Sequence, residues 1–239
     1  MALELLEILN GIFSLIFVSV SIFIGIKIIT KYFYFKRREF ILMGVSWIGI
    51  TSPWWGGSLS LIFSLILGEG LSLQLYLLVT ITSLPLTIFL YLTAITDLVG
   101  KEKQRLILGL IFIIGLIFDI FYIFYSIADP NMLGVLESPI DITYKNFAVF
   151  YILFCLIAFI LGGSVLAINS LKSDNQSVRL QGKFLFLAFI SFFMGALLDA
   201  AVILTLFTLF LTRIVLISSA IEFYIGFILP SGVKNLFIK

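Results

Sequence analysis

The feature that most constrains this chain is a series of seven long apolar stretches separated by short polar gaps. A helix that crosses the hydrocarbon of a bilayer needs about 20 mainly apolar residues. The gaps between the stretches are too short to build a separate soluble domain. We therefore expect seven transmembrane helices, at residues 12–29, 40–67, 71–96, 106–127, 147–168, 184–204 and 209–229.

Composition and pattern favour helices over the strands of a membrane barrel. Hydrophobic residues make up 62% of the 239 residues and charged residues only 12%, which is typical of a chain whose solvent is lipid. Barrel strands alternate apolar and polar side chains, whereas the run 106–112 is apolar at every position. The prediction is an all-α, polytopic integral membrane protein of the cell membrane, with residues 1–239 forming a single seven-helix domain.

The cations of the chain predict its orientation. Thirteen of the fifteen Lys and Arg residues lie in alternate gaps or at the C-terminal end, and short loops rich in Lys and Arg stay on the cytoplasmic side. We therefore expect the N-terminus outside and the C-terminus in the cytoplasm, with the first span retained rather than removed as a signal peptide. These cations are Lys27, Lys31, Lys36, Arg37, Arg38, Lys101, Lys103, Arg105, Lys172, Arg179, Lys183, Lys234 and Lys239.

This topological role accounts for the formal charge of +2, so we expect no nucleic-acid partner. The densest cationic cluster, Lys31 to Arg38 with aromatic residues between the cations, is either a solvated loop or an auxiliary anchor for anionic lipid headgroups.

Residue types and motifs that the chain lacks exclude several kinds of active site and cofactor site. The chain has no histidine and one cysteine, Cys155, which excludes Ser-His triads, histidine metal sites and an intrachain disulfide. No glycine-rich phosphate loop precedes a helix, and the last span has no lysine for a retinal Schiff base. We expect no enzyme activity, no cofactor and no metal.

Four ionisable residues inside the spans are the main functional candidates: Asp119, Asp199, Arg213 and Glu222. Each is costly in lipid unless it is paired or hydrated. A rise of 1.5 Å per residue places Asp119 and Asp199 roughly 20 Å from the cytoplasmic end of their helices, at a depth where Arg213 could pair with either. Glu222 lies on the opposite face of the last helix from Arg213.

The three acids each belong to a helix stripe of small or polar residues, such as Ser191, Gly195 and Asp199. Such stripes either pack helices closely or mark a site sensitive to protons or cations, since three acids face one arginine.

Two spans contain helix-breaking residues. Pro53 is followed by Trp54, Trp55 and two glycines, and Pro85 lies beside several threonines, so we expect a kink in each span. The tryptophans belong either to an interfacial belt or to the mouth of a pocket. The longest loop, 129–144, is either a solvated connector or the cap of an extracellular cavity.

Four short motifs follow one another along the chain: Arg38-Glu39-Phe40, Leu84-Pro85-Leu86-Thr87, Arg179-Leu180-Gln181-Gly182-Lys183 and the run from Gly195 to Asp199. Together they resemble the seven-helix N-terminal sensory region of some prokaryotic histidine kinases. In that family the last helix leads into signalling domains, which do not follow Pro230 here. The resemblance implies a stand-alone sensor that acts through a separate cytoplasmic protein.

We therefore expect a receptor-like membrane module that binds a small or lipidic ligand in the outer half of the bundle. Asp119, Asp199, Arg213, Trp54 and Tyr122 would line or organise the site, with Glu222 as a switch, proton or cation site. The alternatives are a proton- or cation-coupled transporter or channel and a non-catalytic subunit of a membrane complex. We leave open whether the chain forms a homo-oligomer.

Overall fold

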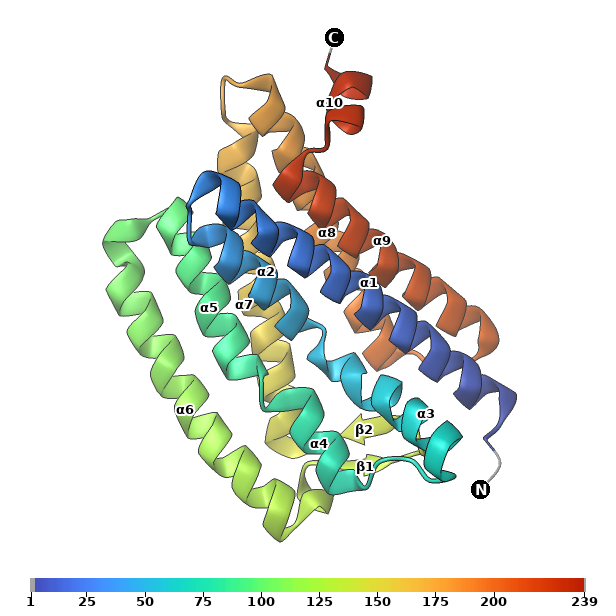
Figure 1. The fold of residues 1–239 in the computed structure, drawn as a ribbon. Helices are drawn as coiled ribbons and strands as arrows, with labels where there is room; N and C mark the ends of the chain where they lie inside the picture. Colours follow the sequence, from blue (N-terminus) through green and yellow to red (C-terminus); the bar gives the residue numbers. More distant parts are fainter. Residues whose placement is uncertain (1–2, 239) are drawn as a thin grey trace.

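The computed structural model describes residues 3–238 as a bundle of long helices (Figure 1). Within this part of the chain, seven helical segments are long and apolar enough to cross a membrane, which confirms the predicted number of spans. The chain is a multi-pass membrane protein. The helices are α1 (Leu5–Phe35), α2 (Glu39–Ile50), α3 (Trp55–Leu67), α4 (Leu73–Ile81), α5 (Leu84–Leu98), α6 (Gln104–Ala128), α7 (Asn146–Leu171), α8 (Gln176–Ala201), α9 (Leu206–Ile228) and α10 (Ser231–Phe237).

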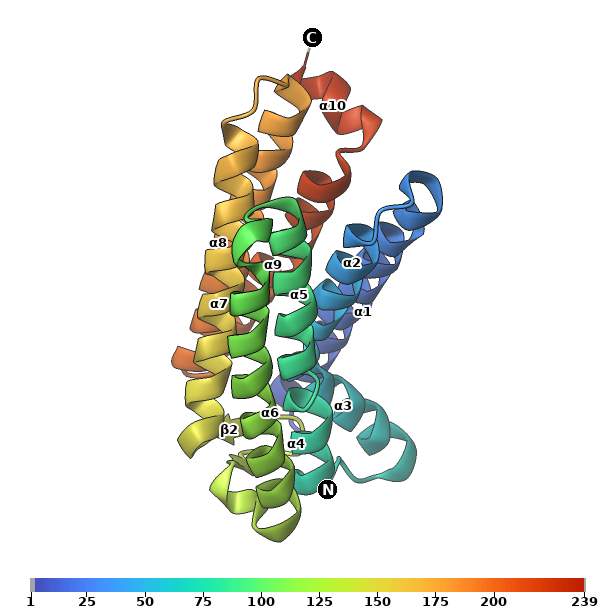
Figure 2. The ribbon, with the colours of Figure 1, turned by 90° about the vertical axis from the view of Figure 1, so that its left-hand side faces the viewer.

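Six of the spans found in residues 3–238 form a closed ring. Packing runs from α1 to α2, α5, α7, α8 and α9, and α9 returns to α1. The remaining span, α6, is the fourth along the chain; it packs mainly on α5 outside this ring and exposes most of its apolar surface. The two ends of the chain lie at opposite ends of the bundle (Figures 1 and 2), as an odd number of crossings requires.

Glycines allow the ring to close tightly. A Cβ atom on Gly25 of α1 would lie 2.7 Å from the carbonyl oxygen of Gly44 in α2. On the far side of the ring, a Cβ on Gly226 of α9 would lie 2.7 Å from the Leu185 nitrogen in α8. Small residues therefore bring neighbouring backbones together, as is common in membrane bundles.

Two spans are interrupted, as predicted. The second span is α2 and α3 joined by a short 3-10 helix, η1 (Ser52–Trp54), and the third is α4 and α5 separated by two residues. Proline removes a backbone donor and clashes with the preceding turn, and Pro53 and Pro85 lie at these two breaks. The Ser52 hydroxyl donates a 2.6 Å hydrogen bond to the Thr80 carbonyl, so the two breaks are also bonded to each other.

An aromatic core fills the middle of the ring. Trp47 of α2 is 1% exposed and stacks on Phe223 of α9, with ring centroids 4.0 Å apart. Phe159 of α7 and Phe192 of α8 pack against the same indole. These large side chains occupy the centre of the bundle and separate its two ends.

The structure differs from the prediction in the loop after α6. Residues of this loop form a short antiparallel hairpin, β1 (Gly134–Leu136) and β2 (Ile142–Tyr144), following a 3-10 turn, η3 (Pro130–Met132). The expected all-α fold therefore carries a small two-stranded sheet at the end of the bundle where α3 and α4 meet (Figure 2). Two hydroxyl groups anchor it, since Ser60 donates to the Pro139 carbonyl and Tyr76 donates to the Ile140 carbonyl.

Several predicted helix limits were wrong. Helix α1 spans Leu5–Phe35 rather than 12–29, and α8 spans Gln176–Ala201 rather than 184–204. Lys31, Arg179 and Lys183 therefore lie within helices rather than in the gaps between them. The 31 residues of α1 extend about 46 Å, which exceeds the hydrocarbon thickness of about 30 Å, so apolar length alone could not predict where the helix ends. Helix α10 and the 3-10 turn η2 (Lys101–Lys103) were also not predicted.

Candidate functional site

A charged group is buried where α1, η1, α8 and α9 meet. Arg213 is 3% exposed, and its Nη1 lies 2.8 Å from Asp199 Oδ1, so of the two partners predicted for it, Asp199 and Asp119, the structure shows Asp199. Arg213 Nη2 donates to Asn10 Oδ1 at 2.8 Å. Trp54 Nε1 donates to Asp199 Oδ2 at 2.8 Å. The four side chains thus form one connected network.

The network compensates the cost of burying two charges. A buried ion pair stabilises a fold only when further hydrogen bonds satisfy its remaining donors and acceptors. Asn10 supplies an acceptor to the guanidinium and Trp54 a donor to the carboxylate. Within residues 3–238, Arg213 Nε and Nη1 have no hydrogen-bond partner, and Nη1 contacts Asp199 only as an ion pair.

The pairing of α8 with α9 positions the two charges. These helices are joined by only residues 202–205 and pack on each other more extensively than any other pair in the bundle. Thr205 caps the start of α9 by accepting a hydrogen bond from the Thr208 amide at 3.2 Å. Because the two helices are antiparallel, Asp199 near the end of α8 faces Arg213, two turns into α9.

This network forms part of the wall of a cavity of about 750 Å³. The cavity has the size and the mixed lining of a small-molecule site, with mainly apolar walls and a few polar groups. The Trp54 indole and Phe192 lie on the wall, and Trp54 packs edge-on against Phe192 of the aromatic core. Apolar side chains on the wall include Ile50, Ile152, Leu156, Phe192 and Ile203.

The hairpin loop lines another side of the cavity, which favours the second of its two predicted roles, a cap rather than only a solvated connector. Glu137, Asp141 and Tyr144 contribute to the wall. Burial raises the pKa of the Asp141 carboxyl above its usual value, and the nearby Asp199 carboxylate raises it further. Burial also raises the pKa of Tyr144 above its usual value.

The other predicted site residues do not line this cavity. Asp119 lies on α6, outside the helix ring, and its Oδ1 is buried without a hydrogen-bond partner among the described residues. Tyr122 donates to the Leu77 carbonyl at 3.0 Å and so attaches α6 to α4. Glu222 lies deeper along α9, and its buried Oε2 also has no partner within residues 3–238. The structure therefore brings together Trp54, Asp199 and Arg213 and leaves the other three elsewhere.

Three residues of the site were missed by sequence reasoning. Asn10 lies before the predicted first span, so its place inside α1 was not considered. Asp141 and Tyr144 belong to the long loop, which was predicted as either a solvated connector or a cap and in which no individual site residue was named. A polar residue within an apolar helix, such as Asn10, was the available signal.

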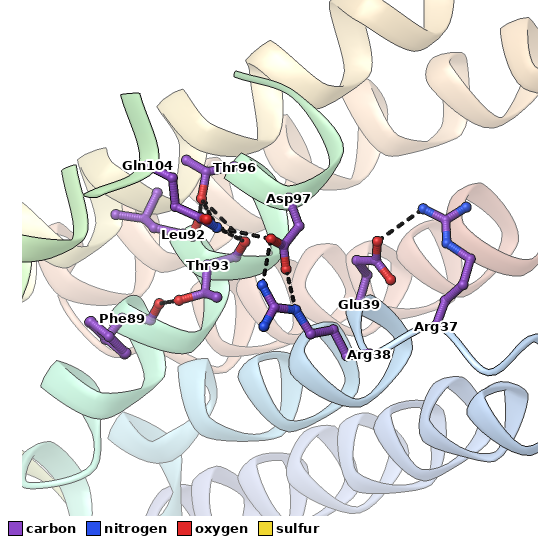
Figure 3. Close-up of polar contacts among 9 residues, drawn as sticks. All are labelled: Arg37, Arg38, Glu39, Phe89, Leu92, Thr93, Thr96, Asp97 and Gln104. Atoms are coloured by element: carbon purple, nitrogen blue, oxygen red, sulfur yellow. Dashed lines mark hydrogen bonds and ion pairs between the residues drawn. The ribbon is translucent and has the colours of Figure 1, made fainter. Parts of the chain in front are cut away.

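A second ion pair lies at the opposite end of the bundle (Figure 3). Arg38 at the start of α2 donates two hydrogen bonds of 2.7 Å to the Asp97 carboxylate near the end of α5. Gln104 at the start of α6 donates to the same carboxylate at 3.0 Å. The Asp97 hydrogen bonds raise the pKa of Arg38 above its usual value. Arg38 therefore has a structural role in addition to the topological role predicted for it, and Asp97 is an ionisable span residue that was not predicted as a candidate.

Comparisons with family models, with curated proteins and with solved structures find no match for this chain. Within residues 3–238, no three His, Cys, Asp or Glu side chains gather closely enough to hold a metal ion. The fold defines the class, a seven-helix multi-pass membrane protein, and the cavity with its charged network is the feature from which a function can be inferred.

Proposed function

We propose that this chain is a receptor-like membrane module that binds a small amphipathic molecule in the cavity at the hairpin end of the bundle. The observation that carries the proposal is the combination of a 750 Å³ cavity, apolar walls and a buried Arg213–Asp199 pair on one wall. Binding sites of small molecules combine these features. Packing alone would favour filling the space, because empty volume destabilises a core.

The position of the cavity favours sensing over passage. The aromatic core around Trp47 and Phe223 fills the bundle between the cavity and the opposite end. A ligand in the cavity would contact the interrupted second span directly, since Ile50, Pro53 and Trp54 are on its wall. Interrupted helices can change conformation more easily than continuous ones, because fewer backbone hydrogen bonds oppose the change.

Signalling would then occur at the other end of the bundle, through a separate cytoplasmic protein. The loops there expose cations, among them Lys36 and Arg37 before α2 and Lys101 before α6. The resemblance to sensory regions of prokaryotic histidine kinases supports the same arrangement.

This arrangement includes an orientation, with the cavity and the N-terminus outside and the C-terminus in the cytoplasm, for which the distribution of cations is the support. Cysteine labelling tests it, because Cys155 is 1% exposed and gives little background. In intact cells, a membrane-impermeant maleimide should label a Glu137→Cys variant and not a Lys103→Cys variant. The reverse pattern would invert the orientation.

Native mass spectrometry tests the binding itself. Protein extracted gently from its own membrane should carry a bound small molecule. An Ala196→Phe variant, which fills the cavity wall, should lose that molecule. An Ala201→Phe variant, on an exposed position of the same helix, should retain it and serves as the matched control. Protein that carries no small molecule, or equal retention in both variants, would contradict the proposal; copurifying proteins without a ligand would favour a subunit of a membrane complex.

One observation favours a second candidate, a proton- or cation-coupled transporter. Interrupted helices beside a polar cavity are typical of transporter sites, and the breaks in the second and third spans lie next to each other. Proteoliposomes should then show electrogenic flux that depends on the cavity carboxylates. If the acids away from the cavity belong to the path, Asp119→Asn and Glu222→Gln should change the pH dependence of that flux. Absence of flux in protein that still binds a ligand separates the receptor from the transporter.

A further inference from the structure

Negatively charged side chains outnumber positively charged ones around the cavity. Arg213 is its only cation among the lining residues described, whereas three carboxylates, Glu137, Asp141 and Asp199, line the same space. Asp199 is already paired with Arg213. Asp141 therefore contributes a negative charge that no cation within the described chain neutralises, and Glu137 adds another at the more exposed edge.

The Asp141 carboxylate is available to a ligand. Its one hydrogen bond within residues 3–238 comes from the Ile142 amide, to Oδ1 at 3.1 Å. Its second oxygen is left without a protein donor in that part of the chain. A carboxylate in such surroundings is stabilised when an opposite charge comes within a few ångströms.

Arg213 does not offer an equivalent site for an anion. Its charge is compensated by Asp199, and Asn10 accepts a hydrogen bond from Nη2. An anionic ligand would have to displace Asp199 and leave that carboxylate without its counter-charge, which is costly in a buried setting. The unpaired Nε of Arg213 can still donate to a neutral oxygen, such as a hydroxyl or carbonyl group of the ligand.

Aromatic side chains form the remaining recognition surface. Trp54, Tyr76, Tyr144 and Phe192 all line the cavity. Aromatic faces attract cations through their quadrupole, by about 0.5–2 kcal/mol for each favourable contact. The apolar walls would contact the hydrophobic part of the same molecule.

We propose that the cavity binds an organic cation with an apolar body, such as a substituted amine or quaternary ammonium compound, whose charge lies beside Asp141. This inference rests on the proposed binding function and adds the chemical class of the ligand. It predicts that affinity follows the charge of the head group when the apolar body is kept constant.

Three water-soluble probes with a common phenyl group test the charge preference: benzyltrimethylammonium, phenylacetate and benzyl alcohol. Binding would be measured by titration with the full-length protein in nanodiscs of zwitterionic lipid, with tryptophan fluorescence as the readout because Trp54 lies on the wall. Benzyltrimethylammonium should bind at least tenfold more tightly than phenylacetate. An Asp141→Asn variant should lose about tenfold of that affinity and bind benzyl alcohol as the native protein does.

The matched control is Asp129→Asn, an exposed acid of the same loop that does not line the cavity. It should leave all three affinities unchanged. Tighter binding of phenylacetate, or an equal effect of the two variants, would overturn the cation class while leaving a binding function in place. If none of the probes binds but native mass spectrometry finds a bound molecule, the cation class also fails and the receptor proposal stands. If neither experiment finds a ligand, both proposals fail.

Discussion

The two ends of the bundle each contain an arginine–aspartate pair, but the exposed partner differs. At the cavity end the Arg213 side chain is 4% exposed and Asp199 is 20% exposed. At the other end the Arg38 side chain is 63% exposed and Asp97 is 5% exposed. The first pair places a carboxylate beside a cavity, whereas the second presents a guanidinium to the surroundings and uses it to hold three helix ends together.

The difference in exposure shows that arginine–aspartate pairs can have different energetic costs within one molecule. A pair with one buried and one half-buried partner, like that at the cavity, is costly to form and very costly to break. A pair with one exposed partner retains hydration and so contributes a moderate amount. The cavity end is therefore the part of the molecule where charge has been buried at a high cost in free energy, which is expected of a functional site.

The largest expected effect comes from breaking the cavity pair. An Asp199→Leu substitution leaves the Arg213 guanidinium buried without its counter-charge, and we expect a loss of roughly 3–5 kcal/mol in the free energy of unfolding. Thermal denaturation of the purified protein in detergent measures this loss. The control is the Asp199→Leu/Arg213→Leu double variant, which removes both charges and should recover most of the stability. A double variant no more stable than the single one would show that pairing is not what Asp199 contributes.

The Arg38–Asp97 pair at the other end should contribute less to the free energy of unfolding. We expect Arg38→Ala to cost about 2 kcal/mol, because it removes two charge-assisted hydrogen bonds while Gln104 still satisfies part of the Asp97 carboxylate. The neighbouring Arg37 pairs only with Glu39, with 57% of its side chain exposed. Arg37→Ala should therefore change stability by less than about 0.5 kcal/mol in the same assay. Equal losses for both variants would remove the distinction between them.

A smaller effect is expected at the hairpin. Tyr76→Phe removes the hydrogen bond to the Ile140 carbonyl and should reduce the local stability of the hairpin by about 1 kcal/mol. Amide hydrogen exchange of residues 134–144 measures this directly. Ser58→Ala is the control, because the Ser58 hydroxyl bonds the Trp54 carbonyl within its own segment. Faster exchange only in the Tyr76 variant would show that this bond anchors the cavity wall.

The smallest effect concerns pH. Because the folded state raises the pKa of Asp141, it favours the protonated form, and stability is lost as the pH rises through that pKa. An Asp141→Asn variant stays neutral, so it should be more stable than the native protein at pH 7. The advantage should shrink as the pH falls towards the usual Asp value of about 4.

Melting temperatures of the two proteins across this range test the pH prediction. Glu137, Asp199 and Arg213 face the same cavity and are present in both proteins, so the difference between the two curves isolates Asp141. A difference that grows on acidification would have the wrong sign and would rule out this origin.

The number of spans and the two kinks could be predicted because they depend on local properties. Apolar length predicts a crossing wherever it occurs, and Pro53 and Pro85 disturb a helix wherever they stand. The Arg213–Asp199 pair was also within reach, since both residues are costly in lipid and lie in consecutive helices. Asp119 was grouped with them by depth, and Tyr122 because it shares a helix face with Asp119, but neither property says on which side of the bundle that helix stands.

The sequence by itself thus determined that this chain crosses a membrane seven times, because each span must satisfy its own backbone and bury its own apolar surface in lipid. Only the tertiary structure decided which helices form the ring, that α6 lies outside it, and that the hairpin loop lines a cavity. Lipid solvates every apolar helix face about equally well, so hydropathy carries little information about neighbours. Close packing of small residues and pairing of a few polar groups make that choice, and these depend on the whole fold.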